Sequence, residues 1–187
     1  MNPLAGKRVL ALGDMAERPL GRFLESLGAQ VRAVTPGDAG LEQALAAADF
    51  LIDPWGLEVL ADRGLPRSRM ESANPRLVHV SVSVFGSGNA RSRWQGAELV
   101  ASAMGGALRL TGEPDRAPVK EALDACTFHA EMAAAAGAMA AHYARGAHGR
   151  GQHVDVSVQE VAFSRNVNGA LVWHFDRRKL HRVGGAL

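Results

Sequence analysis

The stretch LDACTFHAEM, residues 123–132, holds an acid, a thiol, a hydroxyl, an imidazole and a second acid within ten residues. An alanine-rich apolar run, AAAAGAMAAHYA, follows directly, so we expect the stretch at the start of a helix. Backbone N–H groups at a helix N-terminus stabilise a carboxylate or a thiolate and could polarise the carbonyl of a bound thioester. The same stretch also suits a structural role, in which Asp124 or Thr127 caps the helix and Glu131 interacts with its dipole. The local sequence alone favours the structural role.

The composition is that of an ordinary globular domain. The 187 residues are 47% hydrophobic and 21% charged, which favours a single domain. Aromatic residues make up only 5%, so we expect a core of Ala, Val, Leu and Met. A net charge of +2 indicates no basic face, and nucleic acid is not an expected partner. The basic run at 176–182 is expected to be a solvated helix end.

Metal, disulfide and membrane functions are not expected. Cys126 is the one cysteine of the chain, which excludes an internal disulfide and a CxxC zinc site. His142 and His148 have no metal-ligand spacing with an acid or a cysteine. The first residues lack the pattern of a signal peptide, and no apolar run is long enough to cross a bilayer. We therefore expect a cytoplasmic protein without a metal or a membrane partner.

Apolar strands alternate with helical segments along the chain. We expect strands at 7–12, 30–36, 49–53, 77–84 and 152–158, and helices at 20–27, 41–48, 56–64, 95–105, 127–145 and 159–175. Gly28 stands where a glycine often follows a helix end. The alternation predicts an α/β domain with an open, mostly parallel Rossmann-like sheet and helices on both faces.

Three common active-site motifs are missing from this framework. The first strand-to-helix turn reads GDMAERPLG and carries only Gly13 and Gly21, which disfavours a nicotinamide or flavin site of the GxGxxG kind. No P-loop pattern is present. A G-x-S-x-G turn is also absent, which weakens an interpretation as an α/β-hydrolase.

Several longer segments resemble the family III CoA-transferases, also called the CaiB/BaiF family. They are PLAGKRVLAL, LGAQVRAV, ADFLID, NPRLVHVSVSVFGSG, ALRLTGEPDRAPV and GRGQHVDVSVQEVA, in this order over nearly the whole chain. The resemblance implies a Rossmann-like large domain that binds CoA or acyl-CoA in a homodimer of interlocked chains. It also implies a reaction in which an Asp attacks the acyl-CoA, forms a mixed anhydride and passes CoA to a second carboxylate.

The position of that nucleophile is occupied by a threonine. In the family the Asp begins a D-x-x-x-G pattern upstream of GRGQ, and counting back from Gly149 places the Asp at Thr127 and the glycine at Glu131. A threonine ester would trap the acyl group, and no adjacent base is evident for Thr127. Asp124 has the right functional group, and a helix N-terminus would lower the pKa of Cys126. We rank Asp124 above Cys126, and the loss of the nucleophile above both.

The resemblance also predicts which residues contact CoA. The residues at positions that contact CoA in the family are Met15, Ala16, Glu17, Phe85, Gly86 and Glu98. Ala97 replaces the histidine of the racemase relatives, which disfavours isomerase chemistry. An NRGKRS-like segment that contributes to CoA binding is missing before 41–48, and DPWGL at 53–57 replaces an arginine-containing turn.

We therefore expect residues 1–187 to form a single, truncated large domain without the family's second, smaller domain. The expected function is transfer of CoA between carboxylic acids, with coenzyme A as a ligand. We expect this activity to be impaired or to depend on a partner, either in a homodimer or in a heteromer with a full-length homologue. The alternative is a structural or interaction subunit that does not bind CoA.

Overall fold

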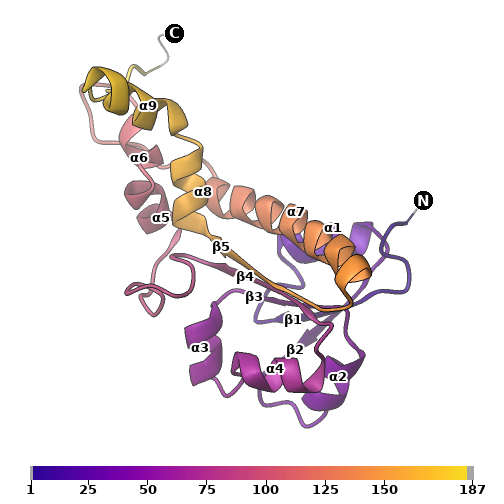
Figure 1. Cartoon of the computed structure of the whole chain (residues 1–187). Coiled ribbons are helices and arrows are strands. Elements are labelled where there is room, and N and C mark those ends of the chain that lie inside the picture. Colours follow the sequence, from indigo (N-terminus) through magenta and orange to yellow (C-terminus); the bar gives the residue numbers. More distant parts are fainter. Residues whose placement is uncertain (1, 185–187) are drawn as a thin grey trace.

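A parallel sheet forms the centre of the computed structural model, which describes residues 2–184 (Figure 1). Its strands are β1 (Arg8–Leu12), β2 (Gln30–Val34), β3 (Phe50–Asp53), β4 (Val78–Ser83) and β5 (His153–Ser157). Within the described residues they lie in the order β2-β1-β3-β4-β5, and every neighbouring pair is parallel. This is the flavodoxin-like doubly wound order, whose switch point lies between β1 and β3. The predicted α/β fold is confirmed.

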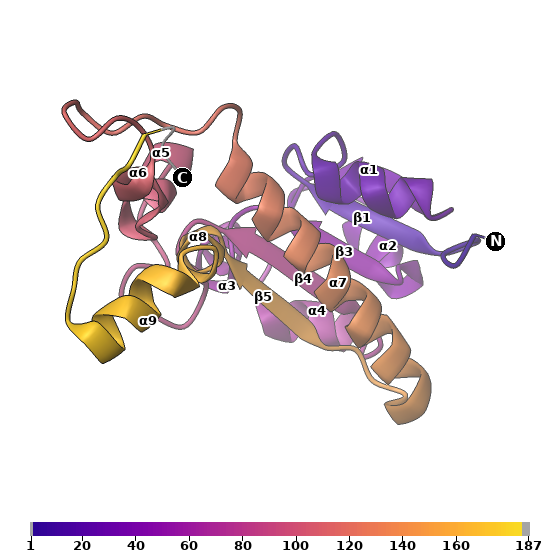
Figure 2. The same cartoon turned by 90° about the horizontal axis from the view of Figure 1, so that it is seen from above.

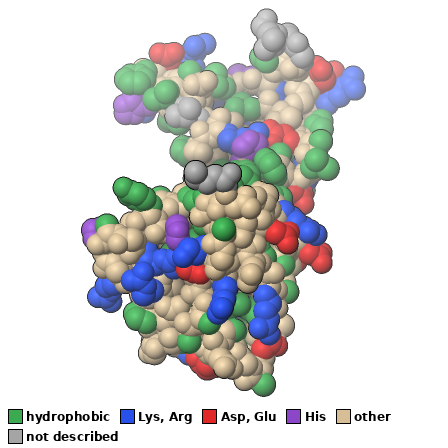
Figure 3. Space-filling view, turned by 90° about the vertical axis from the view of Figure 1, so that its right-hand side faces the viewer, with side chains coloured by type: hydrophobic (Ala, Val, Ile, Leu, Met, Phe, Trp, Pro, Cys, Tyr) green, Lys and Arg blue, Asp and Glu red, His purple; other side chains and the backbone are tan. Residues whose placement is uncertain are grey.

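Helices cover both faces of the sheet (Figures 1 and 2). One face carries α1 (Pro19–Ser26) and α7 (Ala125–His148), and the other carries α2 (Leu41–Ala47), α3 (Leu57–Asp62) and α4 (Arg67–Ala73). Beyond the carboxyl end of the sheet lie α5 (Glu98–Met104), α6 (Ala107–Leu110), α8 (Val158–Ser164) and α9 (Val167–Asp176). Figure 3 shows this outer group set off from the body that contains the sheet, with basic and acidic side chains interspersed on the visible face.

Small side chains let α7 lie close against the sheet. Ala130, Ala134, Ala138 and Ala141 are at most 3% exposed and recur every three or four residues, which places them on one side of the helix. A Cβ added at Gly137 would lie 2.6 Å from a methyl carbon of Val154 on β5. Ala, Val, Leu and Met make up most of the buried core, as expected, and the alanines of α7 bring its start to the carboxyl end of the strands.

Two features differ from the sequence-based expectations for the helices. The helix expected at 159–175 is wrong as a single helix, because α8 and α9 are separated at Arg165 and Asn166. The side-chain amide of Asn166 donates to the carbonyl of Ala162 at 3.0 Å and to that of Gly105 at 3.2 Å, which competes with continued helix formation. Two short helices were not expected: α4, which follows Pro66, and α6.

The remaining boundaries agree more closely. The helix expected at 127–145 begins two residues earlier and ends at His148, before Gly149 with a φ of 72°. Gly28 has a φ of 97° just after α1, as expected for a glycine at this position. Among residues 2–184, no helix combines the length and the apolar character that a bilayer crossing requires.

Candidate functional site

A cavity of about 790 Å³ opens at the carboxyl end of the sheet, next to the ends of β1, β3 and β4. Its walls come from the loop after β1, the residue that follows β3, the end of β4, the segment 96–98 and the first turns of α7. Open parallel sheets bind their ligands at this kind of switch point, because the loops after β1 and β3 lead to helices on opposite faces of the sheet and leave a crevice between them. The topology therefore places the candidate site at the start of α7.

The cavity contains some of the residues expected from the sequence and omits others. Glu98, Asp124 and Thr127 line it. The other lining residues with ionisable side chains, which the sequence did not single out as ligand contacts, are Asp14, Arg18, His129 and Glu131.

The remaining expected residues lie near the cavity rather than in its wall. Met15 is fully buried and Phe85 is 6% exposed, and Phe85 packs edge-on against Trp94 with ring centroids 6.0 Å apart. Ala16 and Glu17 belong to the turn between β1 and α1, and Gly86 lies in the loop after β4 with a φ of 73°. Contact of these residues with CoA stays a prediction.

Glu98 caps the start of α7 from 29 residues away in the sequence. Its two carboxylate oxygens accept from the backbone N–H groups of Cys126 at 2.7 Å and Thr127 at 2.9 Å, and also from the Thr127 hydroxyl at 2.7 Å. Burial by itself would raise the pKa of Glu98, but these hydrogen bonds outweigh it and hold the pKa below its usual value. The helix N-terminus is therefore occupied by an ionised carboxylate of the protein itself.

The expected cap by Asp124 or Thr127 is thus wrong. Asp124 occupies the N-cap position but makes no side-chain capping hydrogen bond. Leu123 before it has a φ of 57°, and the Asp124 side chain points into solvent, 72% exposed and 3.4 Å from the Lys120 ammonium. Thr127 donates its proton to Glu98 and accepts nothing from the helix. Asp124 therefore leaves the N–H groups at the start of α7 to Glu98.

Two expectations about nucleophiles also change. A carboxylate does lie next to Thr127, contrary to the expectation of no adjacent base, but the lowered pKa of Glu98 makes it a weak base. Cys126 is fully buried, and burial followed by the charge of Glu98 raises the pKa of its thiol. The lowered pKa expected for Cys126 is therefore wrong, because burial and then the charge of Glu98 outweigh the influence of the helix N-terminus.

An ion pair fixes the opposite wall of the cavity. Glu131, fully buried on α7, accepts from Nε of Arg18 at 2.6 Å and from the backbone N–H of Leu20 at 2.9 Å. A terminal guanidinium nitrogen of Arg18 lies 2.5 Å from the same carboxylate and another lies 3.6 Å from Asp14. The interaction of Glu131 with the dipole of its own helix stays a prediction; its carboxylate ties α7 to the start of α1.

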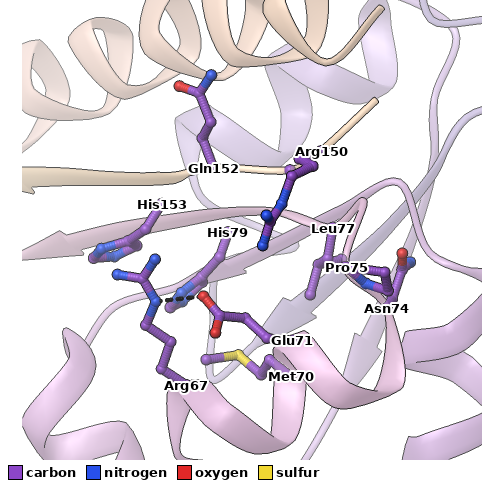
Figure 4. Close-up of a pocket in the computed structure, with 11 residues that line it drawn as sticks. Arg67, Met70, Glu71, Asn74, Pro75, Leu77, His79, Arg150, Gln152 and His153 are labelled. Atoms are coloured by element: carbon purple, nitrogen blue, oxygen red, sulfur yellow. Dashed lines mark hydrogen bonds and ion pairs between the residues drawn. The ribbon is translucent and has the colours of Figure 1, made fainter. Parts of the chain in front are cut away.

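A second, smaller cavity of about 170 Å³ lies on the other face of the sheet, between α4 and the first residues of β4 and β5 (Figure 4). Figure 4 shows His79 and His153 side by side in its wall; their ring centroids are 4.6 Å apart. His79 donates to the buried carboxylate of Asp53 at 2.6 Å, and the Ser81 hydroxyl donates to the same oxygen at 2.7 Å. Because the single proton of Ser81 is used, the 2.9 Å contact with His153 requires Nε2–H of His153 to donate.

This network predicts a loss of stability in mild acid. Burial, followed by the charge of His79, lowers the pKa of His153 from 6.5 to about 4. Between these values the unfolded chain binds a proton that the folded chain does not, so the free energy of unfolding falls as the pH falls through this window. Allowing for the part of the ring that reaches solvent, we expect a loss of roughly 2 kcal/mol between pH 7 and pH 4.5.

Urea denaturation at a series of pH values measures this loss. His153→Gln should reduce the slope, leaving the contribution of His142, whose pKa burial also lowers. His148→Gln, at an exposed position, should leave the slope unchanged. An equal slope in the wild type and in His153→Gln would contradict the prediction.

Neither cavity resembles a metal centre: among residues 2–184, no group of three or more His, Cys, Asp or Glu side chains is placed to hold a metal ion. The chemistry of the larger cavity is that of carboxylates, one guanidinium and a helix N-terminus at a sheet switch point.

Comparison with known proteins places this geometry in context. The model of CoA-transferase family III matches residues 33–186. The formyl-CoA:oxalate CoA-transferase of Streptomyces avermitilis is 31% identical over 124 residues, 66% of this chain and 30% of that protein. The succinate–glutarate CoA-transferase of Agrobacterium fabrum is 25% identical over 150 residues, 80% of this chain and 38% of that protein. The chain thus spans about a third of the curated relatives it matches.

Solved structures show the same fold. A CaiB/BaiF family protein from Brucella suis superposes with a TM-score of 0.90 at 23% sequence identity, over 100% of this chain and 61% of that one. A protein from Mycobacterium tuberculosis superposes with a TM-score of 0.82 at 20% identity, over 94% of this chain and 60% of that one.

Proposed function

We propose that this chain, which belongs to CoA-transferase family III, binds CoA and acyl-CoA and takes part in the transfer of CoA between carboxylic acids. The observation that carries the proposal is the 790 Å³ cavity at the sheet switch point, bounded by the start of α7. The cavity is large enough for the acyl and thioester end of an acyl-CoA. The relatives in Streptomyces avermitilis and Agrobacterium fabrum, both named as CoA-transferases, support the same activity.

We further propose that the transfer step is impaired in this chain or depends on a partner. Thr127 stands where the resemblance places the nucleophilic Asp, and its hydroxyl is hydrogen-bonded to a carboxylate of low basicity. Cys126 is buried with a raised pKa, which removes it as a nucleophile. Asp124 remains an exposed carboxylate in the cavity wall, paired with Lys120 at 3.4 Å.

A partner subunit would supply the missing group. We propose either a homodimer, in which the nucleophile position stays Thr127 in both copies, or a heteromer with a full-length homologue, which would supply its own nucleophile. CoA exchange between two carboxylic acids catalysed by this chain alone would contradict the impairment and would turn attention to Asp124.

A thermal melt with CoA tests the binding proposal. A ligand at about 100 times its Kd adds about 2.7 kcal/mol to the free energy of unfolding, so CoA should raise Tm by roughly 5–10 °C for a chain of this size. ATP at the same concentration controls for nonspecific phosphate binding and should raise Tm far less. An unchanged Tm with CoA would contradict the proposal and favour the alternative, a structural or interaction subunit without CoA binding.

A further inference from the structure

We infer that the cavity selects acyl groups that carry no second carboxylate. The inference rests on the proposed function, in which the acyl end of an acyl-CoA enters the 790 Å³ cavity. A substrate carboxylate in a protein needs a cation or a set of N–H donors to replace its water. The described part of the chain offers two such anion-binding groups in this cavity, the N-terminus of α7 and the guanidinium of Arg18, and both are already occupied.

The N-terminus of α7 is occupied by Glu98. The N–H groups of Cys126 and Thr127 point at its two oxygens, at 2.7 and 2.9 Å, and the hydroxyl of Thr127 adds a third hydrogen bond. A helix N-terminus attracts an anion through these same N–H groups and its dipole. Because the carboxylate of Glu98 is ionised and held there, an incoming substrate carboxylate meets a like charge at that position.

The guanidinium of Arg18 is occupied by Glu131 and Asp14. Two of its nitrogens lie within 2.6 Å of the buried Glu131 carboxylate, and a third lies 3.6 Å from Asp14. Arg18 is the only Lys or Arg among the residues that line the cavity. His129 adds no donor from Nδ1, since that nitrogen donates to the carbonyl of Ala125 at 2.6 Å.

The rest of the wall suits an uncharged chain. Four carboxylates surround the space, those of Asp14, Glu98, Asp124 and Glu131, and the other side chains include Pro54, Val82, Val84, Phe128 and Val158. An apolar acyl group can cover the valine and phenylalanine surface without losing a hydrogen bond to water. A dicarboxylate would bring a second charge into a net negative cavity whose guanidinium and helix N-terminus already face carboxylates of the protein. This contrasts with the oxalate and the succinate and glutarate in the names of the two relatives.

Butyryl-CoA and succinyl-CoA provide a matched test, because both acyl groups have four carbons and differ in the terminal carboxylate. We expect isothermal titration of the wild-type chain to give a Kd about tenfold lower for butyryl-CoA, the preference that one unpaired like charge produces. A succinyl-CoA affinity equal to or higher than that of butyryl-CoA would overturn the inference while leaving CoA binding intact. If neither compound nor CoA itself binds, the proposed function fails, and this inference fails with it.

Variants test whether the carboxylates of the cavity cause the preference for butyryl-CoA over succinyl-CoA. Glu98→Gln removes one charge with little change of shape and should reduce the preference to about threefold. Asp124→Asn changes an exposed side chain, so the fold is retained, and should act in the same direction. Glu71→Gln removes an exposed carboxylate on α4, on the other face of the sheet, and should leave the preference unchanged. An unchanged preference in both Glu98→Gln and Asp124→Asn would also overturn the inference.

Discussion

Replacing Glu131 by alanine is expected to lower the free energy of unfolding by about 3 kcal/mol, because it leaves a partly buried guanidinium and a buried N–H without acceptors. The carboxylate is fully buried and accepts from Nε of Arg18 at 2.6 Å and from the N–H of Leu20 at 2.9 Å. For a chain of this length, the corresponding decrease in Tm is roughly 6–12 °C. Calorimetry of the wild type and the variant measures it.

Asp14→Ala is the matched control, since Asp14 contacts the same arginine from an exposed position at 3.6 Å. Exposed ion pairs contribute little to stability, so its Tm should remain close to that of the wild type. Equal effects of the two substitutions would show that burial does not strengthen the contact with Arg18, and a small effect of Glu131→Ala would contradict the prediction outright.

The importance of Glu131 extends from stability to the site. By joining α7 to the start of α1, it holds two walls of the cavity at a fixed separation. It also neutralises the cavity's one guanidinium, which is the basis of the inferred preference for uncharged acyl groups. The resemblance that places an Asp at position 127 also places a glycine at position 131. Relative to that pattern, the chain lacks a carboxylate at Thr127 and has one at Glu131, so both differences change the charge distribution at the start of α7.

The sequence predicts the layers of the fold well because the sheet is buried on both sides. Each strand is a short apolar run bounded by turn residues, and such runs are recognisable without knowledge of their partners. The break between α8 and α9 was missed because its cause is nonlocal in part: the Asn166 amide bonds the carbonyl of Gly105, 61 residues earlier. A side chain that finds an acceptor in another element overrides local helix propensity.

The site was only partly predictable for the same reason. The reactive stretch at 123–132 and its place at a helix start follow from the order of residue types. The group that caps this helix start could not be predicted from the local sequence. Glu98 comes from a different helix and approaches only after the chain folds. The available signal was the family resemblance, which marked Glu98 as a CoA-contact position without indicating that the residue caps α7.

Replacing Asp53 by alanine is expected to cost about 4 kcal/mol, the largest single effect predicted for this chain. Asp53 ends β3, is fully buried, and accepts four hydrogen bonds. One oxygen accepts from the N–H groups of Trp55 and Gly56, each at 2.8 Å, and the other from His79 at 2.6 Å and Ser81 at 2.7 Å. The variant would leave these donors unpaired where β3 meets β4, and Tm should fall by roughly 8–16 °C.

Two further variants separate the hydrogen bonds of Asp53 from its charge. Asp62→Ala removes an exposed acid that pairs with Arg93 and should change Tm little. Asp53→Asn keeps an acceptor for the turn that follows β3 but places an N–H₂ group against the donors of His79 and Ser81, so its Tm should lie between those of the wild type and Asp53→Ala. An effect of Asp53→Ala no larger than that of Asp62→Ala would contradict the argument.

The pH dependence separates Asp53 from its neighbour His153. Burial by itself would raise the pKa of Asp53, but the hydrogen bonds from His79, Ser81 and the backbone bring it below its ordinary value of 3.8. Its contribution is therefore present above pH 3.8 and is lost as the pH falls through the still lower folded pKa. The contribution of neutral His153 to the free energy of unfolding is lost earlier as the pH falls, between pH 6.5 and about pH 4. In Asp53→Ala the difference from the wild type should hence persist across pH 5–7 and shrink only in stronger acid, which denaturation curves at each pH would show.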